Sequence, residues 1–198
     1  MENKSYLIEN DVIVIDRDLN SLDVFVRDFL RVLRKYSDYL IVSGFVSIST
    51  GRTRGTENVD CLVKEIGRDR FAELFEDLKK SGFWCYQGDS LEEVWRYVEK
   101  GDSIRLARND EIFPNMEFIF VNSSRVAKYF ELTHPQKIRV RDFEFLIPPI
   151  EFEILYKEMV LKGDKDVADA VHLREFFSEY VREEKFEEYR KIIEGELR

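Results

Sequence analysis

The chain has 198 residues, of which 44% are hydrophobic and 36% charged, and its formal net charge is −9. This acidic balance argues against a protein that coats nucleic acid through non-specific phosphate contacts. No stretch approaches the ~18 consecutive apolar residues of a membrane-spanning helix, and the first residues lack the apolar core of a signal peptide. We therefore expect a cytoplasmic protein with no membrane association. Its charged, glutamine-poor composition is typical of proteins from thermophiles.

The first half of the chain is predicted to alternate between strands and helices. Residues 6–15 have a strand-like pattern, and Asp18 or Asn20 is placed to cap a helix that runs to about residue 36. Residues 39–42 predict a buried strand, whereas the periodicity of residues 45–50 fits a strand or a helix. The next elements in chain order are a strand over 59–66, a helix over 68–80, a strand over 83–86 and, after a Ser90–Glu93 capping box, a helix over 90–99.

The following segment continues this alternation. In chain order we predict strands over 104–107 and 116–121, a helix over 123–130, and strands over 137–141 and 143–147. In residues 137–141 charged residues alternate with branched apolar ones, which indicates an exposed edge strand.

Pro148 and Pro149 then mark a change in the pattern. Beyond them helices are predicted over 151–161, 167–179 and 183–194, with Asp164 or Asp166 capping the second. We therefore predict an α+β protein in two parts. Residues 1–147 form a core with a mixed β-sheet and flanking helices, and residues 148–198 form a helical C-terminal subdomain.

The segment from residue 43 to residue 60 combines features that suit a triphosphate. Ser43 and Gly44 end an apolar run, and small residues of this kind let a phosphate chain approach the backbone. Arg54 and Thr56 lie in the polar turn that enters the next strand, where they can contact phosphate oxygens. The alternative is that the glycines here are ordinary turn residues and the arginines are solvated charges. Taken with the spacing to Asp60, the arrangement favours triphosphate binding over this alternative.

Three polar residues on predicted strands are candidates for a metal site. Asn58 and Asp60 are two positions apart on one strand, so their side chains share a face. Glu117 opens a later apolar run and can present a second carboxylate from a neighbouring strand. Carboxylates on one face of a sheet can hold the two Mg²⁺ (or Mn²⁺) ions that activate an attacking oxygen and stabilise a leaving pyrophosphate.

These motifs resemble the DNA-polymerase-beta-type nucleotidyltransferase superfamily, and within it the AbiEii-like and minimal nucleotidyltransferases. In that branch a small residue and a glycine precede, by fourteen positions, the first Asp of an Asp-x-Asp pair, which corresponds here to Gly44 and Asn58. Arg54-Gly55-Thr56-Glu57 fits the segment before the pair, and Glu117 matches the third acid. The resemblance implies an NTP substrate, Mg²⁺ held by Asn58, Asp60 and Glu117, and triphosphate contacts from Ser43, Gly44, Arg54 and Thr56.

The resemblance extends into the C-terminal part. Relatives carry a Pro-x-Glu-x-x-x-x-Lys helix followed by a Lys-Asp-x-x-Asp segment, and here Pro149, Glu151, Glu153 and Lys157 precede Lys165–Asp169. By this resemblance Lys165 is a nucleotide contact. It also implies that a nucleoside monophosphate is transferred to a protein or RNA acceptor and that a cognate antitoxin-type partner exists.

Asn58 departs from this pattern, because an amide offers a metal an oxygen but no charge. Two alternatives to an active transferase therefore stay open. One is a catalytically degenerate module that binds a nucleotide or a partner, and the other is an α+β interaction module with no nucleotide site. Outside this segment, Cys61 and Cys85 are expected to be buried free thiols, and His172 a packed or interfacial residue.

Overall fold

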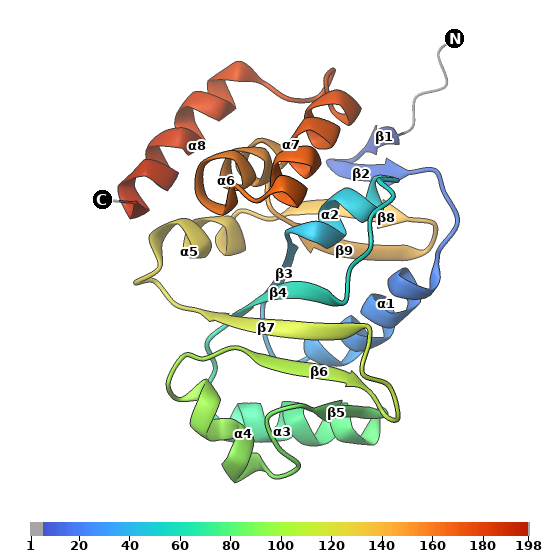
Figure 1. Ribbon diagram of the computed structural model, residues 1–198, viewed down its shortest axis with the longest axis vertical. Helices are drawn as coiled ribbons and strands as arrows, with labels where there is room; N and C mark the ends of the chain where they lie inside the picture. The colour runs from blue at the N-terminus through green and yellow to red at the C-terminus, as the bar shows by residue number, and fades with distance from the viewer. Residues whose placement is uncertain (1–5, 198) are drawn as a thin grey trace.

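The computed structural model describes residues 6–197 (Figure 1) and has the predicted α+β character. The strands form two mixed sheets. The five-stranded sheet contains β3 (Tyr39–Val42), β4 (Asn58–Lys64), β7 (Asn115–Val121), β6 (Ile104–Arg108) and β5 (Phe83–Cys85), in that spatial order. Within this sheet only β4 and β7 run parallel to each other, which brings the starts of these two strands to the same edge of the sheet.

The four-stranded sheet contains β1 (Tyr6–Glu9), β2 (Val12–Ile15), β8 (Gln136–Val140) and β9 (Phe143–Ile147), in that order. The strand-like segment 6–15 is therefore two strands joined at Asn10 and Asp11, which both have positive φ. The prediction that residues 137–141 form an edge strand is wrong, because β8 pairs with β2 on one side and with β9 on the other. Its charged side chains instead make cross-strand ion pairs, such as Lys137–Glu144 at 3.3 Å.

Helices lie at both the upper and the lower end of the molecule in Figure 1, with the strands between them. In chain order they are α1 (Ser21–Leu33), α2 (Gly44–Ser49), α3 (Arg68–Lys80), α4 (Leu91–Val98), α5 (Val126–Thr133), α6 (Ile150–Tyr156), the π-helical turn η1 (Lys157–Leu161), α7 (Asp164–Phe176) and α8 (Glu183–Glu196). Capping boxes begin two of them, at Asn20 with Asp23 and at Ser90 with Glu93. Gly163, and not either aspartate, is the N-cap of α7.

The segment 45–50, whose periodicity was compatible with two structures, is mostly helical as α2. Each face of β4 packs against a different layer. Val59, Cys61 and Val63 join the main core with α1 and α3, whereas Leu62 packs with Leu132 of α5 on the other face. Asn58 and Asp60 follow the parity of Leu62 and therefore face the side that carries α5.

Buried apolar residues from both sides of residue 147, such as Phe145 and Phe152, belong to one continuous cluster. The division at that residue stays a prediction. Within residues 6–197 no helix has the length and apolar character that crossing a bilayer requires.

Candidate functional site

The residues predicted for a metal site come together on β4 and β7. Asp60 lies directly opposite Glu117 in the parallel register of the two strands. Asn58, two positions earlier on β4, donates from its side-chain Nδ2 to Asp60 Oδ1 at 2.8 Å and to Glu117 Oε2 at 3.2 Å. The amide nitrogen of Asn58 thus lies between the two carboxylates, at a point where a cation would contact both.

Glu117 receives further donors from β6 and from Ser103, the residue before that strand. Ser103 Oγ donates to Glu117 Oε1 at 2.9 Å, and Arg105 donates to Oε2 from Nε at 3.1 Å and from Nη2 at 2.9 Å. Arg105 is the direct antiparallel neighbour of Glu117. Arg105, Glu117 and Asp60 therefore form one row across three adjacent strands, because directly opposed residues point to the same face of a sheet.

Burial raises the pKa of Asp60 above its usual value, and the negative charge of Glu117 raises it further. The hydroxyl of Ser43 and the charge of Lys128 act in the opposite direction. Removal from water disfavours the ionised form of a carboxyl group. Asp60 is therefore a carboxylate in a confined, partly desolvated position rather than a solvated surface acid.

The turn at Ser43 and Gly44 lies beneath the guanidinium of Arg54. Ser43 has a φ of 63° at the end of β3, and Gly44 begins α2. A Cβ on Gly44 would stand 3.0 Å from Arg54 Cζ, so the absence of a side chain at Gly44 makes room for the guanidinium. Ser43 and Gly44, the small residues noted in the sequence, therefore make room for the guanidinium of Arg54.

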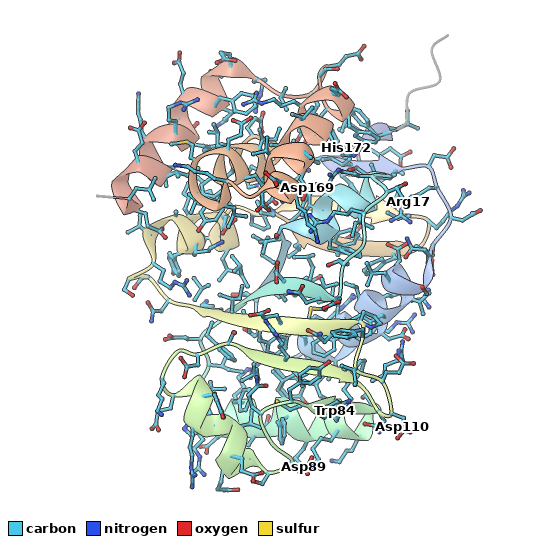
Figure 2. The ribbon with its side chains drawn as sticks, viewed as in Figure 1. Arg17, Trp84, Asp89, Asp110, Asp169 and His172 are labelled. Atoms are coloured by element: carbon cyan, nitrogen blue, oxygen red, sulfur yellow. The ribbon has the colours of Figure 1, made fainter. Side chains whose placement is uncertain are left out.

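A buried aspartate on α7 fixes Arg54 in this position. Asp169 is fully buried, and its two carboxylate oxygens accept from Arg52 and Arg54 respectively. Lys157 Nζ, also fully buried, lies 3.2 Å from the same carboxylate and 3.1 Å from Glu153. Figure 2 shows Asp169 on α7 beside α2, in the upper half of the molecule with His172 and Arg17. This cluster connects the C-terminal helices to the segment before β4.

The sequence pattern did not predict that Asp169 pairs with Arg52 and Arg54. The signal that was available is the Lys-Asp-x-x-Asp spacing, whose last member is Asp169. Its partners are 115 and 117 positions earlier in the chain, and pattern analysis of a single sequence cannot pair such residues.

Two predicted contacts lie apart from this arrangement. Thr56 Oγ1 donates to the backbone carbonyl of Asn58 at 2.7 Å, which shapes the entry into β4. Lys165 is exposed in the first turn of α7, and no interaction described for residues 6–197 links it to β4 or β7. His172 is packed as expected: it is half-buried, its Nε2 lies 2.9 Å from Thr50 Oγ1, and its ring contacts Phe176.

A groove of about 830 Å³ opens beside Arg54, Gly55 and Thr56. Its walls include apolar side chains from α1 and the Phe113–Pro114 segment before β7. Ligand pockets commonly have volumes of roughly 300–1,000 Å³. A cavity of ligand size therefore adjoins the arginine that lies over Gly44.

The described residues do not fit a site for two divalent cations. Asp60 and Glu117 are the carboxylates that β4 and β7 contribute to this face, Arg105 neutralises one of them, and Asn58 contributes no charge. Two Mg²⁺ ions carry four positive charges and need several oxygen ligands each. Within residues 6–197 no group of three His, Cys, Asp or Glu side chains is arranged to hold a metal ion.

A scan of the sequence against protein-family models returns no match, and a search of curated proteins returns none either.

Proposed function

We propose that this protein binds a nucleoside triphosphate at a nucleotidyltransferase-like site whose capacity for transfer has been weakened or lost at Asn58. The observation that carries the proposal is the position of the Asn58 amide, which donates to both Asp60 and Glu117. It is supported by the strand arrangement, in which parallel β4 and β7 align the two acids, and by the resemblance of the surrounding motifs to the AbiEii-like branch.

Nucleotidyl transfer makes demands that this chain meets only in part. An acceptor oxygen attacks the α-phosphorus while the bond to pyrophosphate breaks, so negative charge develops on the phosphoryl and leaving-group oxygens. Arg54 and Arg52 supply positive charge near the Ser43–Gly44 turn, which suits a bound polyphosphate. On β4, the carboxylate that the superfamily pattern expects at residue 58 is replaced by an amide that carries no charge. Binding is therefore better supported than turnover.

An active transferase is the competing function, and one observation favours it. Asp60 and Glu117 are both retained and face each other in register. In that case the resemblance implies transfer of a nucleoside monophosphate to a protein side chain or an RNA end, with Mg²⁺ or Mn²⁺ as cofactor and a cognate antitoxin-type partner. The metal, the acceptor and the partner remain proposals.

A paired binding and transfer experiment separates the two functions. Affinity for each NTP is measured by calorimetry, and transfer by label from each α-labelled NTP into cell extract with Mg²⁺ or Mn²⁺. Wild type, Asn58→Asp and Asp60→Ala are compared with Asn109→Asp, which adds the same charge at an exposed position. We expect wild type to bind NTP without detectable transfer, and Asn58→Asp alone to gain transfer.

Two results would count against the proposal. Transfer by wild type that Asp60→Ala abolishes would establish the competing function. Absence of NTP binding by wild type and by Asn58→Asp would leave an α+β interaction module without a nucleotide site.

A further inference from the structure

Arg105 occupies the solvent side of the carboxylate row. Its side chain is 48% exposed, whereas that of Glu117 is 16% exposed. Nε and Nη2 both donate to the same Glu117 oxygen, and Nη1 makes no hydrogen bond among those described for residues 6–197. One side of the guanidinium is thus bound to the protein, and the other has a donor directed away from Glu117.

We infer that Arg105 replaces a divalent cation at this site, so that the protein binds a polyphosphate without metal. The inference rests on the proposed nucleotide-binding function. It assigns Arg105 two roles: it neutralises Glu117, and it offers Nη1 to a phosphate oxygen. Asn58 completes the replacement, because its amide satisfies the carboxylate oxygens that would otherwise face a metal.

Charge balance supports this assignment. Asp60, Glu117 and Arg105 together leave a single net negative charge in the row. A site with this balance has little attraction for a second cation, whereas a metal-dependent nucleotide site needs excess negative charge to hold the ion. The charge balance therefore disfavours a divalent cation at the row.

The geometry of the row supports it as well. Arginine presents its donors in a rigid planar fork, which can hold a carboxylate with one edge and a phosphate with another. Arg105 pairs with Glu117 of β7, and its carbonyl accepts from Tyr86 N at 2.9 Å, so its backbone does not need to be ordered on binding. Ser103 donates to the second oxygen of Glu117 and leaves that carboxylate with donors on both oxygens.

Two titrations test the inference on the full chain. The first follows free Mn²⁺ by electron paramagnetic resonance. The second follows a fluorescent ATP analogue in excess EDTA and again in Mg²⁺. The variants are Arg105→Gln, Arg105→Lys, Asn58→Asp and the double variant Asn58→Asp/Arg105→Gln. Arg68→Gln is the matched control, because it removes an exposed Arg–Glu pair of similar length, to Glu92 at 3.1 Å.

We expect wild type to bind no Mn²⁺ and to bind the nucleotide equally well in EDTA and in Mg²⁺. Arg105→Gln should weaken binding in EDTA by at least about tenfold, the usual effect of losing a hydrogen bond to a charged group. Arg105→Lys should lose less nucleotide affinity than Arg105→Gln, because the charge remains. Arg68→Gln should bind the nucleotide as tightly as wild type. The double variant should gain Mn²⁺ binding, since it removes the internal cation and restores a carboxylate.

Mn²⁺ binding by wild type that Asp60→Asn abolishes would overturn the inference, and so would nucleotide binding that requires Mg²⁺. If wild type binds no nucleotide under either condition, the proposed function fails. The Mn²⁺ titration then still decides whether Arg105 replaces a metal. Mn²⁺ binding by the double variant supports this role. No Mn²⁺ binding by a double variant that has a native circular dichroism spectrum overturns it.

Discussion

The guanidinium of Arg54 lies directly over Gly44, so that a Cβ on Gly44 would stand 3.0 Å from Arg54 Cζ and 3.1 Å from both terminal nitrogens. Arg54 cannot simply turn away, because Asp169 holds it from α7. Within the segment 43–60, Gly44 and Arg54 are thus in direct contact, and Asp169 fixes the position of the arginine.

Gly44→Ala tests this contact. Alanine is compatible with the helical backbone at this position, so the added methyl acts through Arg54 alone. We expect an affinity loss for triphosphate of about tenfold, equivalent to roughly 1.4 kcal/mol, and a loss of stability of about 1 kcal/mol. Calorimetry and urea denaturation measure the two effects. Gly55→Ala is the control, because no atom lies within 4 Å of a Cβ there; equal effects at both glycines would contradict the role of Arg54.

Asp169→Asn should be strongly destabilising. The substitution leaves Arg52, Arg54 and Lys157 around a neutral side chain, and Lys157 is completely buried. Breaking a buried ion pair by removing one partner costs about 3–5 kcal/mol, and we expect a loss in that range in urea denaturation.

Asp38→Asn is the matched control for this substitution. It removes the same charge from an exposed pair with Lys64 at 3.2 Å, where the expected cost is about 0–1 kcal/mol. Similar losses in the free energy of unfolding for the two variants would show that the ion pairs of Asp169 do not hold the C-terminal helices to the segment before β4.

The sequence allowed most of the elements to be predicted, because their signals are local. The helix over Arg68–Lys80 and the strand over Phe143–Ile147 have the predicted bounds, and the capping box at Ser90 is present. The pairing of strands is not local. Alternating charge in residues 137–141 looks like an edge, yet β8 is interior because β2, more than 120 positions earlier, pairs with it in parallel.

The same distinction applies to the candidate site. Asn58 and Asp60 share a face by simple parity, and their approach to Glu117 followed from the expectation of a neighbouring strand. Arg105 gave no such signal, because one arginine on an alternating strand looks like any solvated charge. Its role emerges only from the antiparallel register that sets it against Glu117.

The two cysteines should be unreactive in the folded protein. Cys61 and Cys85 are free and buried, and burial raises the pKa of both thiols, that of Cys85 to about 11. At pH 8 such a shift lowers the thiolate fraction by roughly a hundredfold relative to an ordinary cysteine. A thiol-reactive dye should therefore label the native protein very slowly. After unfolding it should label both thiols. An engineered cysteine at exposed Ser178 gives the rate for an accessible thiol, and equal rates would disprove burial.

Glu131 should make stability depend on pH near neutrality. It is buried on α5 with Lys128 Nζ 3.1 Å away, and burial raises its pKa to about 7 despite the opposing charge of Lys128. The unfolded chain titrates this group near the ordinary glutamate value of about 4.3. Between these two values the folded protein holds more protons than the unfolded chain, so the free energy of unfolding should rise as pH falls from about 8 to about 5.

Glu131→Gln isolates this contribution, because the raised pKa of Asp60 is common to both proteins. Glutamine keeps the shape and an acceptor for Lys128 but binds no proton in this range. The two curves of unfolding free energy against pH should differ in slope by up to about 1.4 kcal/mol per pH unit. Wild type should lose stability relative to the variant as pH rises through about 7. Parallel curves from pH 5 to 8 would mean that Glu131 stays ionised in the folded protein.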